Sequence, residues 1–268
     1  MDVYHLNQIP SEAQIKKFFR RTLFGTNIYC PICKRRQVSA HEDRYWCSKC
    51  RRWFSLLSDT WLANMKLPLQ QFWLVLWCWT TQIPVKQTMA LSELSEKAVR
   101  HWYEAFRTHL PFEPELLEAI VQLDEAYFGG RMGYALLMGK QVGTRKLAYH
   151  VLPHSSPAKE DAWAFLQTYV RPETTLQTDG GGIYKQIDQW WPVNHKYELH
   201  KHWEFVLTSE IEGMFGNLRT FIRRMYHHVT PEKLPEVVCE FCFRFSHPEM
   251  FKNPRYYLQN TLSLAPTG

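Results

Sequence analysis

Four cysteines in two C-x-x-C pairs constrain the fold of this chain more than any other feature. Cys30 and Cys33 form the first pair, and Cys47 and Cys50 form the second after thirteen intervening residues. Each pair can wrap one turn around a metal ion, and two such turns provide the tetrahedral four-thiolate shell that zinc prefers. We therefore predict a zinc ribbon over residues 27–57, with zinc in a structural role. Two disulfides or four buried thiols are the alternative interpretation.

The charge of the chain is mildly basic and unevenly distributed. The formal net charge is +6 over 268 residues, which is compatible with a polyanionic partner. Residues 30–53 contain seven Lys and Arg against two Asp and Glu. If the partner is a polyanion such as DNA, the expected contacts from the ribbon are Lys34, Arg35, Arg36, Arg51 and Arg52.

Several features favour a cytoplasmic protein, which would be associated with the nucleoid in a prokaryote. The first ten residues lack a basic segment followed by an apolar run, so we predict no signal peptide. The longest apolar run is Phe72–Trp79, which is too short to span a bilayer. Seven cysteines, four of them in a metal pattern, are typical of a reducing compartment. We expect no membrane partner.

The N-terminal part outside the ribbon reads as helical. Residues 11–25 form a predicted helix that Ser11 caps and Gly25 ends, within an N-terminal segment 1–26. In the segment 58–112, helices are expected from Pro68, from Pro84 and from a cap at Ser95. Three helices with a short middle one are consistent with an HTH-like (helix-turn-helix) DNA-binding unit, and equally with a plain helical linker bundle.

Beyond a Pro-rich linker at residues 111–115, the pattern changes to mixed α/β over 113–248, followed by a C-terminal tail, 249–268. Three strands within residues 119–153 are expected to form an antiparallel meander. A helix over 158–170, a strand with a glycine turn over 174–182, a strand over 196–201 and two helices follow. The predicted element order is β-β-β-α-β-α-β-α-α. Cys239 and Cys242 form a third C-x-x-C in an apolar helix, where core packing is the better interpretation.

Two aspartates stand where a buried carboxylate is unusual. Asp124 is expected near the end of the first strand, and Asp179 closes a later strand before three glycines. Neighbouring strands lie about 5 Å apart, so carboxylates on adjacent strands can converge on hard cations. We predict that both bind a pair of catalytic Mg²⁺ or Mn²⁺ ions.

A third acid is expected from the long helix that follows. Glu212 lies in its first turn, and Arg219 lies two turns further on nearly the same face. A carboxylate that holds metal beside an arginine suits a phosphodiester substrate. Glu210 is the alternative third acid, but it lies about 160° around the helix from Glu212, so both cannot face the metals. Arg223 and Arg224 extend the basic end of the helix and are predicted phosphate contacts, although they equally fit a favourable charge at the negative end of the helix dipole.

Several motifs occur together in one order along the chain. They are the cysteine ribbon, WFSLLSDTW, MKLPLQQFW, LDEAYFGG, TDGGGIY, IEGMFGNLRTFIRRMYHHVTPEKL and EFCFRFSH. In this order the chain resembles zinc-ribbon insertion-sequence transposases of the 1595 family over about residues 25–247. The resemblance implies an RNase H-like catalytic domain with a DDE metal site formed by Asp124, Asp179 and Glu212. It also places Arg219 where relatives usually have a lysine.

The sequence thus predicts a DDE transposase that binds terminal inverted repeats and target DNA and transfers strands. Because strand transfer requires two ends held together, a homo-oligomer on DNA is expected by analogy. Relatives commonly have His-Thr-Asn where this chain has Leu207, Thr208 and Ser209. An inactive, transposase-derived DNA-binding protein is therefore one alternative function. An RNase H-like nuclease that cleaves without joining is another.

Overall fold

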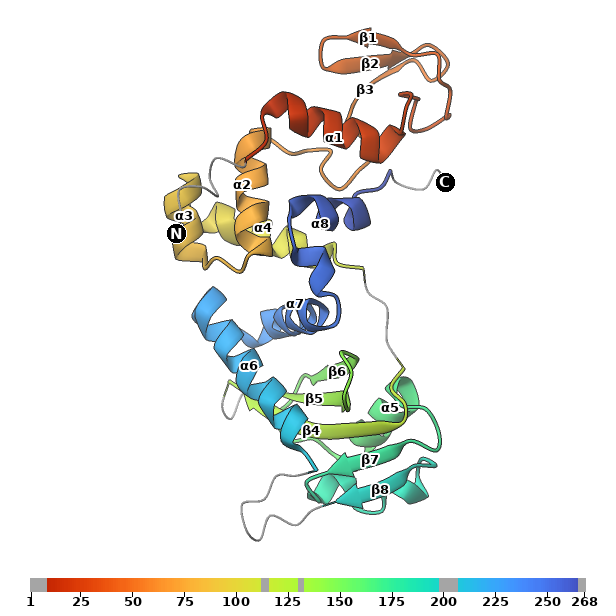
Figure 1. Cartoon of the computed structure of the whole chain (residues 1–268), viewed down its shortest axis with the longest axis vertical. Coiled ribbons are helices and arrows are strands. Elements are labelled where there is room, and N and C mark those ends of the chain that lie inside the picture. The colour runs from red at the N-terminus through yellow and green to blue at the C-terminus, as the bar shows by residue number, and fades with distance from the viewer. Residues whose placement is uncertain (1–8, 112–115, 130–132, 198–206, 265–268) are drawn as a thin grey trace. The chain divides into compact units, whose positions relative to one another are not determined.

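The computed structural model describes residues 9–111, 116–129, 133–197 and 207–264. The chain divides into two compact units (Figure 1). The first contains Met1–Pro111 together with Glu249–Gly268, and the second contains Phe112–Pro248. Among the described residues, no helix has the length and apolar character needed to cross a membrane.

The first unit begins with a helix and a small sheet. Helix α1 (Glu12–Phe24) starts at Ser11, whose side chain and that of Gln14 form a reciprocal capping box. The antiparallel ribbon has the strand order β1-β2-β3, with bounds β1 (Ser39–His41), β2 (Arg44–Cys47) and β3 (Arg52–Ser55). The cysteine pattern predicts the ribbon but does not itself indicate strand β3. This strand forms because Phe54 is buried and stacks on Tyr45, its partner across the ladder, at 5.4 Å between ring centroids.

The predicted three-helix arrangement is present after the ribbon. The helices are α2 (Leu69–Thr80), α3 (Val85–Ser92) and α4 (Glu96–Thr108), and Ser95 caps the last. The predicted tail also contains helix α8 (Pro254–Thr261), preceded by the short η6 (Pro248–Phe251). Tyr257 of α8 is fully buried, and its hydroxyl donates to the Phe106 carbonyl at 2.9 Å. The end of the chain is therefore part of the core of the first unit.

The second unit is built on a five-stranded mixed sheet. Its strands, in the spatial order β6-β5-β4-β7-β8, are β4 (Ile120–Phe128), β5 (Tyr134–Gln141), β6 (Leu147–Leu152), β7 (Thr175–Thr178) and β8 (Asn194–Tyr197). The first three form the predicted antiparallel meander. Strand β7 pairs parallel to β4, and β8 pairs parallel to β7.

The element order after β7 corrects the prediction. Where a helix was expected between the last two strands, the structure has only two single-turn 3₁₀ helices, η3 (Gly182–Tyr184) and η4 (Ile187–Gln189). The glycines that follow Asp179 and the left-handed residue Gln186 (φ +62°) interrupt this stretch before an α-helix can extend. Strand β8 begins before its predicted span of 196–201, of which residues 198–201 lie outside the described part of the chain.

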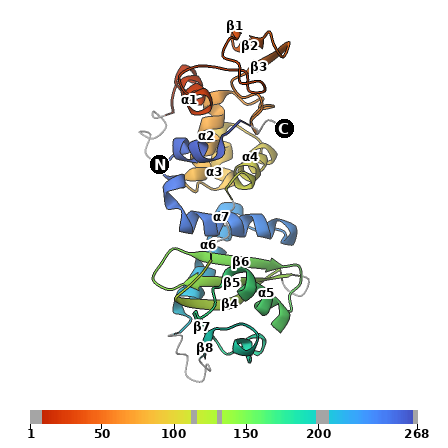
Figure 2. The same cartoon turned by 90° about the vertical axis from the view of Figure 1, so that its right-hand side faces the viewer.

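Helices cover both faces of this sheet (Figure 2). Helix α5 (Lys159–Tyr169) covers one face, where Val121, Leu123 and Phe165 share a buried cluster. Helices α6 (Ser209–Tyr226) and α7 (Leu234–Ser246) cover the other face, and η5 (Pro231–Lys233) connects them. Because side chains alternate along a strand, Asp124 points to the α6 side.

Candidate active site

The pairing of β4 with β7 brings Asp124 and Asp179 side by side. Gln122 pairs with Gln177 in the parallel register, and each aspartate stands two residues further along its own chain. The Gln122 amide also lies 3.4 Å from the Gln177 oxygen. Because side chains repeat every second residue, both carboxylates project from the face that the two glutamines share.

The sequence predicted Asp124 near the end of its strand. In the structure it lies in the middle of β4. Strand β7 stops at Thr178, whereas β4 continues to Phe128 with β5 as its partner. The sheet therefore opens beside Asp124, on the side where β7 has ended. Beyond Gln122, the edge of β4 that faces β7 has no ladder partner among the described residues.

The Asp124 carboxyl is buried and electrostatically strained. The residue is 7 % exposed, and its Oδ1 accepts from the Glu125 N–H at 2.8 Å. Burial raises the pKa of Asp124 to about 8, and the negative charges of Glu125, Asp179 and Glu212 act in the same direction. Three further acids thus act on one buried carboxyl, which is the electrostatic pattern of a site that takes cations.

The glycine turn after β7 shapes the second position. Asp179 Oδ1 accepts from the Gly181 N–H at 2.8 Å, and Gly180 has φ +76°. A Cβ atom on Gly181 would lie 3.0 Å from that oxygen, which is closer than ordinary contact. Glycine at this position therefore lets the backbone fold back against the carboxylate.

Helix α6 brings Glu212 to the same place. The Ile211 N–H donates to Gln122 Oε1 at 3.0 Å, which ties the first turn of the helix to β4 two residues before Asp124. Glu212 is exposed, unlike Asp124. Asp179 from the turn after β7 and Glu212 from α6 both lie close enough for their negative charges to raise the pKa of Asp124.

Glu210 is engaged elsewhere. Its Oε2 lies 2.9 Å from Lys140 Nζ, and its Oε1 accepts from the Gly143 N–H at 3.3 Å. Lys140 is buried on β5, so this contact anchors the start of α6 to the β5–β6 turn. Glu210 therefore binds a buried lysine, whereas Glu212 acts on Asp124.

Tyr184 was not singled out by the sequence, although it lies only two residues after the glycine run. It is fully buried, and its hydroxyl donates to Glu125 Oε2 at 2.6 Å. Burial, and then the Asp179 charge, raise the pKa of Glu125. Glu125 follows Asp124 along β4 and projects from the opposite face of the strand, and the Tyr184 contact links it to the turn that carries Asp179.

The expected basic residues of α6 lie at the surface. Arg219 is exposed, and its guanidinium sits 5.9 Å from the Phe128 ring centroid, at the far end of β4 from Gln122. Arg223 and Arg224 are exposed one turn further on. Arg219 and Arg223 lie on nearly the same face of α6, whereas Arg224 lies about 140° around the helix from Arg219.

The four cysteine sulfurs of the ribbon form a tight cluster. Potential ligand atoms of Cys30, Cys33, Cys47 and Cys50 all lie within 4.8 Å of one another. The Cys30–Cys50 and Cys33–Cys47 sulfur distances are 3.8 Å and 3.6 Å. A tetrahedron of 2.3 Å zinc–sulfur bonds separates its sulfurs by about 3.8 Å, whereas a disulfide needs about 2.05 Å. The cluster therefore fits a zinc ion and does not fit disulfides.

Basic side chains surround this cluster. Lys34, Arg35, Arg36 and Arg51 are exposed, and Arg52 lies 3.8 Å from Asp59. A backbone hydrogen bond from Arg35 is the main cause that lowers the pKa of the Cys33 thiol to about 7. The contact with Cys33 is in turn the main cause that raises the pKa of the Cys50 thiol to about 12, so the pair holds its proton on Cys50.

The carboxylates are more widely spaced than the cysteines. In the part of the chain that the structure describes, only the cysteines bring three or more ligand atoms within 4.8 Å of one another. Oxygens that bind the same Mg²⁺ ion lie about 3 Å apart, so the carboxylates would have to move closer together to share an ion. Their oxygens suit Mg²⁺ or Mn²⁺, and positive charge would relieve the repulsion on Asp124.

The second unit is thus an α/β domain with acidic residues gathered where its sheet opens. Residues 116–246 match the family of the ISXO2-like transposase domain, within the IS1595 group. This segment is therefore a transposase domain of that family.

Two further comparisons were found. The chain is 22 % identical over 229 residues to an uncharacterized protein in transposable element ISH50 of Halobacterium salinarum (strain ATCC 700922 / JCM 11081 / NRC-1), covering 73 % of this chain and 76 % of that protein. The crystal structure of the catalytic core domain of BIV integrase is similar at a TM-score of 0.32 and 8 % identity, covering 47 % of this chain and 82 % of that one. At that TM-score the likeness adds no support to the assignment.

Proposed function

We propose that this chain is a DNA transposase that cleaves and joins DNA strands with two divalent cations held by Asp124, Asp179 and Glu212. One observation carries the proposal. Asp124 and Asp179 extend from a shared register on β4 and β7, and the tie between Ile211 and Gln122 brings Glu212 to them. The ISXO2-like transposase match over the same unit supports the reaction class.

The strand arrangement supports an RNase H-like fold for the second unit. Three antiparallel strands are followed by two strands parallel to the first, which lies in the middle of the sheet. Helices lie on both faces. This arrangement places the first and fourth strands next to each other, which a pair of metal-binding aspartates on those strands requires.

Each residue has a distinct task in this proposal. Asp124 and Asp179 hold the cations from the sheet, and Glu212 holds them from the helix. Bound Mg²⁺ or Mn²⁺ supplies Lewis-acid chemistry: it activates water or a 3′-hydroxyl and neutralises the charge that develops on the phosphate. Arg219, Arg223 and Arg224 bind the flanking backbone from the exposed side of α6.

The first unit is proposed to bind terminal inverted repeats. Residues 1–111 contain sixteen Lys and Arg against eight Asp and Glu, so the positive charge of the chain is concentrated there. Residues 93–95 form a short turn between α3 and α4, which suits an HTH-like unit. Zinc at the four cysteines keeps the ribbon folded, and Lys34, Arg35, Arg36, Arg51 and Arg52 contact phosphates. Strand transfer at two DNA ends calls for a homo-oligomer.

A strand-transfer assay tests the proposal, with the DNA that borders the gene as donor and a supercoiled plasmid as target. We expect Mg²⁺-dependent cleavage and joining by the wild type and none by Asp179→Ala. Normal joining by Asp179→Ala would refute the assignment of the site. Binding without cleavage by the wild type would identify the inactive DNA-binding protein, and cleavage without joined products would identify the nuclease.

A further inference from the structure

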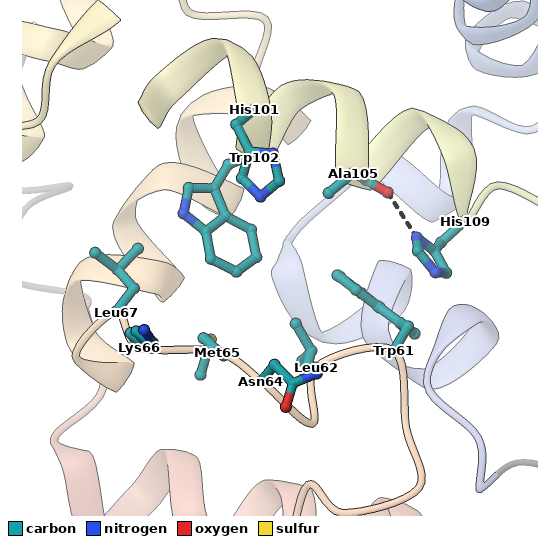
Figure 3. A pocket seen from close by; sticks show the side chains of 10 residues that line it. All are labelled: Trp61, Leu62, Asn64, Met65, Lys66, Leu67, His101, Trp102, Ala105 and His109. Atoms are coloured by element: carbon teal, nitrogen blue, oxygen red, sulfur yellow. Dashed lines mark hydrogen bonds between the residues drawn. The ribbon is translucent and has the colours of Figure 1, made fainter. Parts of the chain in front are cut away.

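A cavity of about 620 Å³ lies in the first unit, away from the cysteine cluster. Helix α4 forms one wall, and the chain segment 61–67 forms the other (Figure 3). Trp102 projects from the helix, and Trp61 stands on the opposite segment. Nothing proposed above gives this cavity a role. Its volume is in the range that takes a nucleotide-sized ligand.

The Trp61 ring is held in place on two sides. It stacks on His109 with 4.3 Å between ring centroids and 21° between their planes. Its Nε1 donates to the Thr261 carbonyl at 3.2 Å, and His109 Nδ1 lies 2.7 Å from the Ala105 carbonyl. A ring that is already fixed loses little conformational freedom when a ligand packs against it.

The Trp102 ring is also supported from behind. It packs edge-on against Phe72 at 5.3 Å and lies 5.9 Å from Phe106, both centroid distances. The residue nevertheless is only partly buried and lines the cavity. A supported aromatic side chain that lines an open cavity is a platform for stacking.

The polar groups of the cavity suit an anionic partner with hydrogen-bonding edges. Lys66, Asn64 and His101 are exposed and line the cavity, and none of its lining residues is acidic. The surrounding residues 1–111 carry the surplus of eight positive charges described above. An apolar peptide would gain from the aromatic rings but not from this charge.

We propose that this cavity receives an unpaired nucleobase of bound DNA, an inference that rests on the proposed DNA-binding function. The base stacks on the aromatic rings, with Trp102 as the main platform. Asn64 and His101 face its polar edges, and Lys66 neutralises the adjoining phosphate. Stacking of one base on an aromatic side chain strengthens binding by about tenfold, and it tolerates any base.

Binding of two short duplexes of the same sequence tests the inference. One is fully paired, and the other carries a single unpaired 2-aminopurine. The zinc-loaded full-length protein is titrated with each duplex without Mg²⁺. We expect about tenfold tighter binding of the bulged duplex and quenching of the 2-aminopurine fluorescence.

Two variants are expected to remove the preference for the bulged duplex over the paired duplex, each in a different way. Ala105→Phe fills the cavity from α4 without deleting a supporting ring, and Trp102→Ala removes the platform. Both are expected to bring the affinity ratio of the two duplexes to about one while paired-duplex affinity stays unchanged. Trp190→Ala is the matched control, because Trp190 is 47 % exposed and lies in the second unit. Zinc content and thermal unfolding check the fold of each variant, and Ala105→Phe decides if Trp102→Ala fails to fold.

Each contrary result is informative. Equal affinity of the wild type for both duplexes would overturn the inference and leave DNA binding by the first unit intact. A preference that survives Ala105→Phe would overturn it by placing the base elsewhere. No affinity for either duplex would overturn it together with the proposed DNA-binding function. The strand-transfer assay measures joined DNA products and is independent of the duplex titration. If the protein prefers the bulged duplex but joins no strands, only the catalytic proposal is refuted.

Discussion

The Nζ atom of Lys140 lies 2.9 Å from Oε2 of Glu210, and the lysine side chain is only 4 % exposed. The same Nζ donates to the backbone oxygens of Gln141 and Thr144 at 2.8 Å and 2.5 Å. The buried lysine therefore links the β5–β6 turn to the first turn of α6. Because Glu212 follows two residues later, this contact helps to fix where Glu212 stands over β4.

Lys140→Met is expected to destabilise the second unit by roughly 1–3 kcal/mol, because it leaves the Glu210 carboxylate without its cation. The loss falls below that of a fully buried pair, since the Glu210 side chain is 38 % exposed. Thermal unfolding measures the change. Lys146→Met is the control, because Lys146 is 43 % exposed and 3.8 Å from Glu118. An equal loss in both variants would contradict the anchoring role.

Glu212→Gln and Glu210→Gln distinguish the two acids of α6. Glu212→Gln should lower strand transfer by about 10²–10³-fold, since it removes a carboxylate from the proposed metal site. Glu210→Gln should retain activity within about tenfold, because the amide oxygen can still accept from Lys140 and only the longer contact with the Gly143 N–H is lost. Rates at saturating Mg²⁺ measure both effects. The reverse order of activities would move the third acid to Glu210.

The hydrophobic patterns of the chain predict most of the elements that position the site. Periodicity along 209–226 identifies α6, and short apolar segments bounded by glycine turns identify β4 and β5. The spacing of Asp124 and Asp179 does not determine that β4 and β7 are neighbours. Contacts between distant parts of the chain determine that β4 and β7 are neighbours. They also determine that β7 ends at Thr178, before it reaches the level of Asp124.

The sequence does not predict which side chains form contacts with residues far away along the chain. The Lys140–Glu210 pair spans seventy residues, and neither residue type indicates its partner. The bond between Tyr184 and Glu125 depends on the path of the glycine turn, which local propensities describe poorly. Helix α8 was missed because its stability comes from burial of Tyr257 against α2 and α4.

The purified protein should contain about one zinc ion per chain, which Cys30→Ser abolishes. The reason is that three remaining thiolates leave the tetrahedral shell open, and the ribbon has little apolar core of its own to hold β1–β3. Metal analysis under reducing conditions measures the ratio. Cys239→Ala is the control, because this half-buried cysteine of α7 stands outside the cluster and should leave zinc content unchanged. Equal zinc in Cys30→Ser and the wild type would contradict the four-thiolate site.

Asp124 should make the second unit less stable as pH rises between about 4 and 8 without Mg²⁺. Its pKa is raised to about 8 in the folded chain from an ordinary value of 3.8, so over this window the folded state keeps a proton that the unfolded state has lost. The contribution is fully present below pH 4, declines by at most about 1.4 kcal/mol per pH unit and is lost above pH 8. Asp124→Asn should remove this slope and be the more stable form at pH 8.

Calorimetric unfolding across pH measures the difference between the wild type and Asp124→Asn, in which the contributions of other groups cancel. Added Mg²⁺ should raise the Tm of the wild type at pH 8, because cations bind the folded site and displace its proton. The same addition should change Asp124→Asn much less. Asp161→Asn is the matched control, since this aspartate lies on α5 at the opposite face of the sheet. A pH slope that persists in Asp124→Asn would assign the raised pKa to another carboxyl of the cluster, and Glu125→Gln would then be the variant that removes it.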